Sequence, residues 1–211
     1  MIGRREGFAW RRGLALAALV LYGCASPPPP IVGIEGRNCA TTIEFGGAHQ
    51  LRLASGNAVT VDLDQDTPCW QANDGGRSAY VVFALPDNIE PYLVTVTSPA
   101  LGQTLFAPRL IMLDGLGNTQ REMPRDSFAF HGSSLYLGIR VYPSEKYLMV
   151  ASDPKAVGQQ VSQLKAGTQE TTASSGGIYF TIHTGFETNQ SFTYALNGRV
   201  IVSAEPIPKA R

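Results

Sequence analysis

The side chains that could do chemistry are scattered along this chain of 211 residues. None of its three histidines, His49, His131 and His183, has a second histidine two or four positions away, the spacing that would place two ligands on one face of a strand or helix. No Gly-x-Ser-x-Gly elbow, phosphate loop or dinucleotide fingerprint occurs. The sequence therefore predicts a non-enzymatic protein without a cofactor. A hydrolase whose triad assembles from distant residues stays a third alternative.

One acidic segment raises the question of a cation site. Asp62, Asp64 and Asp66 alternate in the stretch VDLDQDTP, so an extended chain would place three carboxylates on one face. Such a face could hold Ca²⁺. The segment lacks the glycine and the distal glutamate of a calcium loop, and a solvated strand edge is the preferred interpretation.

The chain also carries aromatic residues of the kind on which sugars stack, although a β-sheet core uses the same residues. They are Trp70, Tyr80, Tyr92, Phe106, Tyr136 and Tyr142. Trp70 lies in the polar segment CWQANDGG and is the one most readily placed at a surface. Arg77 and Arg109 are the cations nearest to such aromatics in the sequence. Trp70, Arg77 and Arg109 are therefore the weak ligand-binding candidates.

The N-terminal segment has the pattern of a secretory signal over residues 1–23. Four arginines, at positions 4, 5, 11 and 12, precede an apolar run over 14–21 that is too short for a membrane-spanning helix. The ending Leu-Tyr-Gly-Cys at 21–24 resembles a bacterial lipobox, which predicts lipidation of Cys24 and attachment to membrane lipid. An ordinary signal peptide with a chance cysteine is the alternative. By resemblance to sorted lipoproteins, Ala25 after the cysteine points to the outer membrane.

The lipidated cysteine would be followed by a stiff tether. Residues 27–30 are four prolines, which favour an extended polyproline II spacer. We assign residues 24–36 to this tether and 37–211 to a single domain.

The two remaining cysteines are predicted to form a disulfide. An oxidising periplasm permits a bridge between Cys39 and Cys69. Two free thiols are the alternative, and a zinc site is disfavoured because neither cysteine belongs to a Cys-x-x-Cys pair.

Charge excludes one class of partner. The full chain balances 17 basic against 17 acidic residues, and loss of the signal would leave 13 basic and 16 acidic. No basic run remains, so the sequence predicts no nucleic-acid partner.

Most of the chain has the periodicity of β-strands. Alternation over 58–63 and 92–97 predicts half-buried strands, and the continuous apolar run 78–85 predicts a central strand covered on both sides. Further strands are expected at 109–114, 135–141, 146–151, 177–184, 192–196 and 199–203. Asn197-Gly198 between the last two predicts a two-residue hairpin turn.

Residues 153–167 are the exception. Asp153 can cap a helix, Pro154 suits its first turn, and apolar residues recur at helical spacing at 157, 161 and 164. We expect one amphipathic helix here, followed by an exposed Thr- and Ser-rich loop over 168–176. The predicted fold class is mainly β: an antiparallel β-sandwich, jelly-roll-like, with this one short helix.

Three segments carry a family resemblance. The runs YVVFALPDNI at 80–89, VTVTS at 94–98 and QTLFAPRLIMLD at 103–114 resemble the maltose operon periplasmic protein (MalM-like) family. The blocks at 146–150 and 177–182 are compatible with it, so the resemblance would cover about residues 55–203. Two departures weaken transfer of a specific maltose role: the predicted lipidation, and a chain that ends soon after its last strand.

The resemblance implies an exported protein associated with maltose or maltodextrin uptake, and it offers no catalytic residues to carry over. We therefore expect a non-catalytic outer-membrane lipoprotein, facing the periplasm, that binds an oligosaccharide or an envelope partner. The alternative is a structural or assembly lipoprotein that docks on another envelope protein complex.

Overall fold

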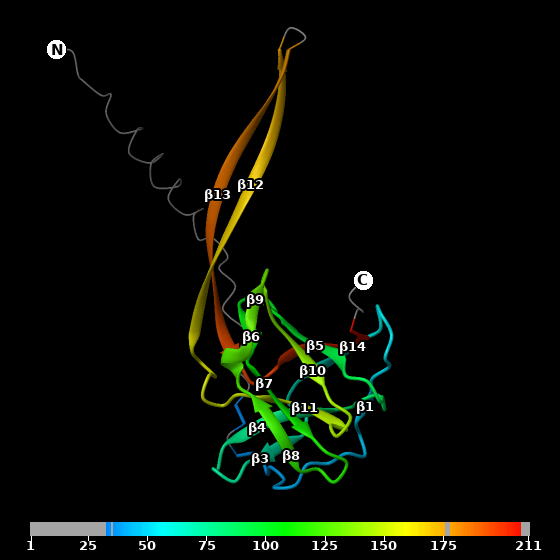
Figure 1. The fold of residues 1–211 in the computed structure, drawn as a ribbon. Helices are drawn as coiled ribbons and strands as arrows, with labels where there is room; N and C mark the ends of the chain where they lie inside the picture. The colour runs from blue at the N-terminus through cyan, green and yellow to red at the C-terminus, as the bar shows by residue number, and fades with distance from the viewer. Residues whose placement is uncertain (1–32, 35, 176–177, 208–211) are drawn as a thin grey trace, which may run out of the picture.

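Apolar runs in the central part of the chain build two β-sheets that share one hydrophobic core (Figure 1). The computed structural model describes residues 33–34, 36–175 and 178–207. The predicted signal peptide, Cys24 and most of the tether lie outside these described residues. No helix in the described ranges is both long and apolar enough to cross a membrane.

The first sheet has six strands. Its order is β1 (His49–Gln50), β4 (Arg77–Ala84), β11 (Tyr147–Ser152), β7 (Pro108–Leu113) and β8 (Thr119–Met123), and β3 (Cys69–Gln71) also pairs with β4. β1 runs parallel to β4, and the other pairs are antiparallel. The continuous apolar run predicted as a central strand is β4, which is buried over almost its whole length.

The second sheet has five strands, all antiparallel. Their order is β2 (Ala58–Leu63), β14 (Gly198–Pro206), β5 (Tyr92–Pro99), β10 (Ser134–Val141) and β9 (Ala129–His131). In β5, buried residues alternate with half-buried ones, as the period-two pattern of the sequence predicts. Val94 and Val96 on β5 share a core cluster with Leu110 on β7 and Leu148 on β11. The two sheets therefore pack as a sandwich, which confirms the predicted mainly β fold class.

A second cluster covers the outer face of the first sheet. Ile111, Met149 and Val82 are buried there, and the segment before β1 packs over them with Ile43 and Phe45. The N-terminal segment is thus part of the fold, because it removes an apolar sheet face from water.

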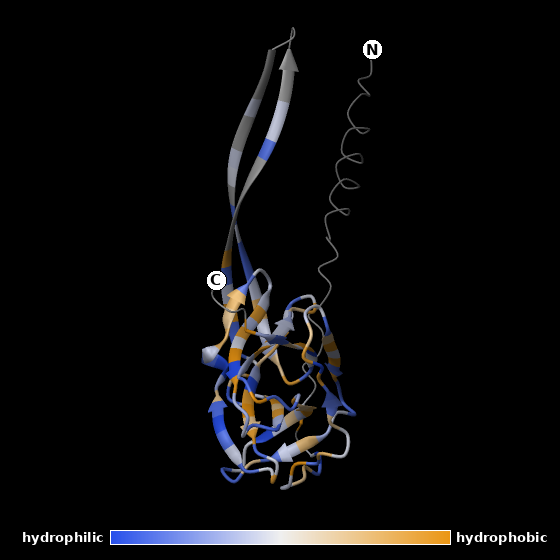
Figure 2. Cartoon of the chain, turned by 45° about the vertical axis from the view of Figure 1, so that its right-hand side comes forward, coloured by the Kyte–Doolittle hydropathy of each residue, from blue (hydrophilic) through white to orange (hydrophobic). Residues whose placement is uncertain are grey.

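A third sheet holds the two longest strands. β12 (Gln160–Ser175) pairs with β13 (Ile178–Ala195), and β13 pairs in parallel with β6 (Thr104–Phe106). Most of β12 and β13 forms a ribbon that projects from the body (Figure 1). Figure 2 shows the apolar residues of the described chain concentrated in the body. The ribbon is defined below as residues 160–175 and 178–193.

The predicted helix over 153–167 is wrong. Asp153 does cap a turn, because its Oδ1 accepts a hydrogen bond from the Lys155 amide at 3.0 Å. The turn ends at Gly158, which has a φ of 80°, and β12 begins at Gln160. Pairing with β13 along the whole of β12 satisfies the backbone and outweighs the weak helical spacing. The expected loop over 168–176 is also wrong, because β12 extends to Ser175.

The hairpin predicted at Asn197-Gly198 is likewise wrong. β13 and β14 do not pair with each other: the chain passes there from the third sheet to the second. Gly198 has a φ of 154°, and a Cβ on it would lie 2.7 Å from the Cβ of Phe106. The glycine is required by close approach to β6 and not by a two-residue turn. The strands expected at 177–184 and 192–196 are parts of one strand, β13.

Candidate functional site

Two of the residues proposed for ligand binding lie together near the disulfide. Trp70 is on β3, where it pairs with Ser78 of β4, and Arg109 is on β7, where it pairs with Ala151 of β11. The Arg109 guanidinium carbon lies 5.4 Å from the centre of the Trp70 ring. This distance allows a cation–π interaction. Arg77, the third candidate, begins β4 opposite Gln71 and is not among the described residues that line the recess defined below.

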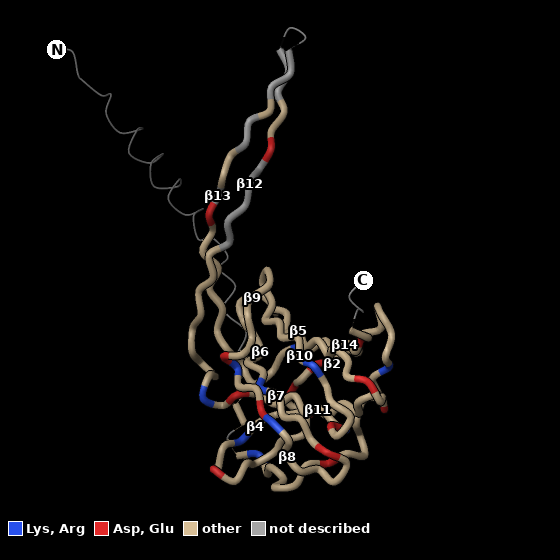
Figure 3. The backbone as a smooth tube through the Cα atoms, viewed as in Figure 1, with Lys and Arg blue, Asp and Glu red and all other residues tan. Residues whose placement is uncertain are grey.

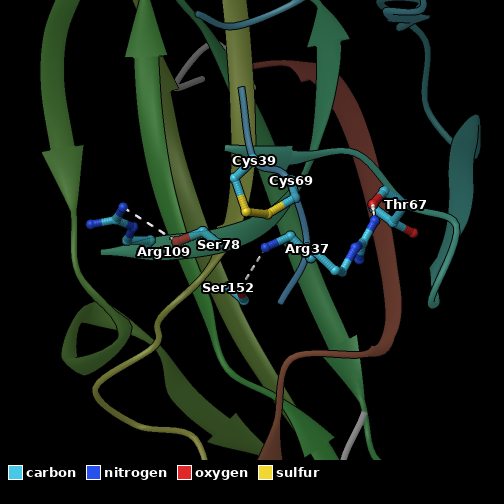
Figure 4. Close-up of a disulfide and its surroundings, with 8 residues drawn as sticks. Arg37, Cys39, Thr67, Cys69, Ser78, Arg109 and Ser152 are labelled. Atoms are coloured by element: carbon cyan, nitrogen blue, oxygen red, sulfur yellow. Dashed lines mark hydrogen bonds between the residues drawn. A yellow bond between two sulfur atoms is a disulfide. The ribbon is translucent and has the colours of Figure 1, made fainter. Parts of the chain in front are cut away.

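Arg109 is held by three neighbours and is largely buried. Its side chain is 16% exposed; Nη1 lies 3.3 Å from Glu122 Oε1, and Nη2 donates to Ser78 Oγ at 3.5 Å. Figure 4 shows the hydrogen bond from Arg109 to Ser78 close to the disulfide. Nε is buried without a hydrogen-bond partner among the described atoms. Both terminal contacts are long, so the donors of Arg109 are incompletely used.

Arg109 forms part of the wall of a surface recess of about 420 Å³, which we call the arginine recess. Its lining residues are Asp74, Gly76, Arg109, Glu122, Pro124, Asp153, Pro154 and Lys155. The recess thus brings three carboxylates and two cations around two prolines. Fixed carboxylate and guanidinium groups beside apolar surface can bind the hydroxyls and ring faces of a saccharide.

Trp70 cannot present a free ring on the side that Arg109 covers. The residue is half-buried and packs against the outer cluster of the first sheet. Trp70 therefore supports the guanidinium of Arg109, which lines the recess, without lining the recess itself. The sugar-stacking role expected of Trp70 from the sequence stays a prediction.

A second recess, of about 390 Å³, lies at the root of the ribbon, and we call it the amide recess. It is lined by Gly102, Gln103, Gln160, Asn189, Gln190, Ser191, Phe192 and Thr193. Its polar side chains are neutral amides and hydroxyls. It could also hydrogen-bond a saccharide, but it lacks the charged pair found in the arginine recess.

Two carboxylates of the acidic segment make contacts with neighbouring groups in the described part of the chain. Asp62 accepts hydrogen bonds from Arg199 at 2.6 and 3.0 Å, and the hydrogen bond from this guanidinium holds its pKa below the usual range. Asp64 Oδ1 accepts from the amides of Asp66 and Thr67 and closes its own turn. No group of three His, Cys, Asp or Glu residues that could hold a metal occurs among the described residues. The calcium hypothesis over Asp62, Asp64 and Asp66 therefore has no support.

The two histidines whose side chains are described make separate ring contacts. His49 lies on β1 with its ring 5.7 Å from that of Phe83, and His131 lies on β9 with its ring 6.2 Å from that of Tyr136. His183 belongs to the ribbon. These contacts belong to separate parts of the fold.

Sequence reasoning missed the acidic and basic residues that complete the arginine recess. Asp74, Glu122, Asp153 and Lys155 belong to no motif and come from three separate segments, because Asp153 and Lys155 share one turn. Asp153 and Lys155 fell inside the expected helix, so their place beside β7 could not be foreseen.

The disulfide predicted between Cys39 and Cys69 is present (Figure 4), with a Cα–Cα distance of 4.6 Å. It holds the N-terminal segment against β3, where the Ala40 amide also donates to the Cys69 carbonyl at 2.9 Å. The bridge thereby anchors the N-terminal segment that covers the first sheet. It also fixes Cys69, the residue next to Trp70.

We expect the paired substitution Cys39→Ala and Cys69→Ala to destabilise the protein. The bridge joins residues 30 positions apart. Because it restricts the unfolded chain, a loop closure of this length stabilises the folded protein by about 3.6 kcal/mol in the chain-entropy model. Urea unfolding followed by tryptophan fluorescence measures the change. Reducing agent should lower the parental midpoint and leave the double variant unaffected; an equal response of both proteins would contradict the prediction.

One known protein family matches the central part of the chain. Residues 75–152 match the model of the family described as maltose operon periplasmic protein precursor (MalM). No curated protein matches the sequence significantly. The matched segment begins just before β4 and ends with β11, so it contains β4, β11, β7 and β8 of the first sheet and β5, β10 and β9 of the second, while the disulfide, the ribbon and β14 lie outside it. It also contains Arg109 and Glu122 of the arginine recess.

The family description refers to a periplasmic protein of a maltose operon. Over residues 75–152 of its sandwich, the chain is therefore similar to MalM, as the three sequence runs indicated.

Proposed function

We propose that this protein is a non-catalytic lipoprotein, attached to the outer membrane through Cys24 and facing the periplasm, that supports maltodextrin uptake by binding an oligosaccharide. The observation that carries the proposal is the arginine recess inside a MalM-like sandwich. The signal pattern and the lipobox support the location, and the family description supports the link with maltose.

The recess suits a neutral, hydroxyl-rich ligand. The acidic groups of Asp74, Glu122 and Asp153 can accept hydrogen bonds from sugar hydroxyls, and Arg109 and Lys155 can donate to sugar oxygens. Opposite charges within the recess reduce its attraction for a strongly charged ligand. Rigid support of Arg109 by Trp70 and Ser78 limits the entropy lost on binding.

Binding should be visible as a rise in the melting temperature. We would use the exported chain carrying Cys24→Ser, which removes the predicted lipid attachment, and titrate maltodextrins beside other oligosaccharides. A ligand that binds only the folded state stabilises it by about 2.7 kcal/mol at one hundred times its dissociation constant. If no oligosaccharide moves the midpoint while the protein melts cooperatively, the binding proposal fails.

Arg109→Ala is expected to weaken sugar binding by about 10- to 100-fold, because a hydrogen bond from a charged group contributes roughly 1.5–3 kcal/mol. Isothermal titration calorimetry measures the affinity. The matched control is Gln103→Ala, which alters the amide recess and should leave affinity unchanged. The opposite result, with binding lost only in Gln103→Ala, would move the site to the root of the ribbon.

A second function is favoured by one observation: the outer edge of β12 has no partner strand among the described residues. An exposed strand edge can pair with another envelope protein. In that case the chain would be a structural or assembly lipoprotein, and pull-down of one specific protein by the exported chain, without any sugar response, would support it.

A further inference from the structure

β13 forms the second long edge of the ribbon, and β6 covers only one end of it. The two strands pair in parallel at 193–195 of β13. Immediately before β6 the chain turns away: the backbones of Leu101 and Thr104 hydrogen-bond each other at 2.9 and 3.2 Å, with Gly102 at a φ of 63°. From Phe192 toward the ribbon tip, β13 has no strand on that side in the described part of the chain.

Backbone hydrogen bonds at the ribbon root show which groups of β13 face this edge. The Thr193 amide donates to the Gln103 carbonyl at 2.8 Å, on the β6 side. The Tyr194 amide donates to the Gln159 carbonyl at 3.0 Å, on the β12 side. Successive residues of a strand direct their N–H and C=O groups to opposite sides. The odd-numbered residues here therefore face the β6 side.

Ser191 and Asn189 continue this pattern beyond the end of β6. β12 and β13 pair without a register shift, so the alternation is kept. The Ser191 hydroxyl lies 3.0 Å from that of Ser162, its partner on β12. Such close side chains are typical of a non-hydrogen-bonded pair, in which both residues direct their backbone groups away from each other. The N–H and C=O groups of Ser191 and Asn189 thus lie on an open strand edge.

The amide recess lies along this open edge. It is lined on one side by Gly102 and Gln103 of the turn and on the other by residues 189–193 of β13. Gln160 pairs with Thr193, so the polar side chains at 160, 189, 191 and 193 share one face of the ribbon root. A strand placed in the recess would extend the line of β6 and direct alternate side chains toward these amides and hydroxyls.

This edge lacks the features that commonly keep strand edges free. The lower part of β13, beside β6, is tan in Figure 3 because residues 188–193 carry no charged side chain. The same segment contains no proline and no register shift. Charged residues, prolines and bulges are the usual means of preventing another chain from pairing with an edge. The edge is therefore suited to accept a strand.

We propose that the β13 edge at Asn189 and Ser191 binds an extended peptide segment of a partner protein, which adds a strand to the ribbon in line with β6. The open backbone groups repeat at every second residue, about 7 Å apart, and an extended peptide repeats at the same spacing. A third strand also stabilises a two-stranded ribbon, which is marginal in water by itself. The neutral recess favours Ser, Thr, Asn or Gln at alternate positions of the peptide. This site is separate from the arginine recess and from the β12 edge.

Hydrogen exchange of the free protein tests the open edge without a ligand. We would follow it by NMR in the exported chain carrying Cys24→Ser. The amides of Ser191 and Asn189 should exchange rapidly, whereas the Thr193 amide, bonded to Gln103, should be protected. Slow exchange at Ser191 and Asn189 in the free protein would show that the edge is already covered, and would overturn the proposal.

Binding is measured with peptides selected against the same protein from a phage-displayed library of random linear peptides. Ser191→Pro removes the N–H on the proposed edge, and Ser162→Pro removes the N–H of its partner, which faces the opposite edge of the ribbon. Both variants lose the same contact between hydroxyls, so they are matched. Fluorescence anisotropy should show affinity weakened about tenfold or more by Ser191→Pro and within about threefold of the parent in Ser162→Pro.

Bound peptide should also slow exchange of the Ser191 and Asn189 amides, and thermal melting checks that both proline variants fold. The proposal fails if no peptide is enriched over an unrelated protein, or if both variants bind as the parent does or weaken equally. Weakening by Ser162→Pro alone would also overturn it, because strand addition would then occur at the β12 edge.

Discussion

Ile111→Asp should unfold the protein. Ile111 is 3% exposed at the centre of β7, opposite Met149 of β11, in the cluster beneath the N-terminal segment. The described neighbours in that cluster are hydrophobic side chains, so a carboxylate placed there would be buried among apolar groups. Burial of an unpaired charge costs several kcal/mol, against a total stability of roughly 5–15 kcal/mol for a domain.

Far-ultraviolet circular dichroism and thermal melting of the purified variant measure this outcome. Ile111→Val is the matched control, because it removes one methylene from the same site and should cost only about 0.5–1.5 kcal/mol. A cooperative Ile111→Asp protein with the parental melting temperature would show that the outer face of the first sheet is open to water.

The inner strands could be predicted from the sequence because their pattern is local. β5 alternates because one of its faces packs into the core, and β4 is continuously apolar because the N-terminal segment covers its second face. The FAPRLIML stretch becomes the last residue of β6, the link at Ala107 and the whole of β7, with Pro108 at the start of β7, where the absence of an N–H does least harm. These features depend on the residues of each strand and its immediate neighbours.

The ribbon could not be predicted because its stability depends on pairing between distant positions. Val161 and Leu164 have helical spacing when β12 is considered alone, but Val161 lies opposite Phe192 in the structure. The Thr- and Ser-rich continuation suggested a loop for the same reason: its partner strand follows only after residue 177. Strand pairing overrides weak local preference, and the sequence of one strand does not show its partner.

The candidate site was foreseen only in part. Trp70 and Arg109 were proposed from their residue types, but nothing in the sequence indicated that they contact each other. Their contact depends on the strand order β3, β4, β11 and β7, which no local pattern encodes. Arg77 was proposed on equal grounds and lies away from the described lining of the recess. Residue types suggest which side chains could bind a ligand, but the strand order determines which of them come together in one site.

A buried ion pair between β8 and the turn after β10 carries the second large effect. Glu145 is 3% exposed and receives Arg121 in a two-pronged contact, with Nε to Oε1 at 2.6 Å and Nη2 to Oε2 at 3.1 Å. The Tyr142 amide also donates to Oε2 at 2.9 Å. The carboxylate therefore holds together a strand and a turn from different parts of the chain.

Arg121→Met should destabilise the protein by about 3–5 kcal/mol, because it leaves the Glu145 charge buried with no cationic partner. Glu145→Gln should cost less, on the order of 1–2 kcal/mol, since Gln can still accept from the Tyr142 amide and Arg121, which is 34% exposed, can turn to water. Urea unfolding at neutral pH measures both. A larger loss of stability in Glu145→Gln than in Arg121→Met would contradict the prediction, because it would mean that the arginine depends on the pair more than the carboxylate does.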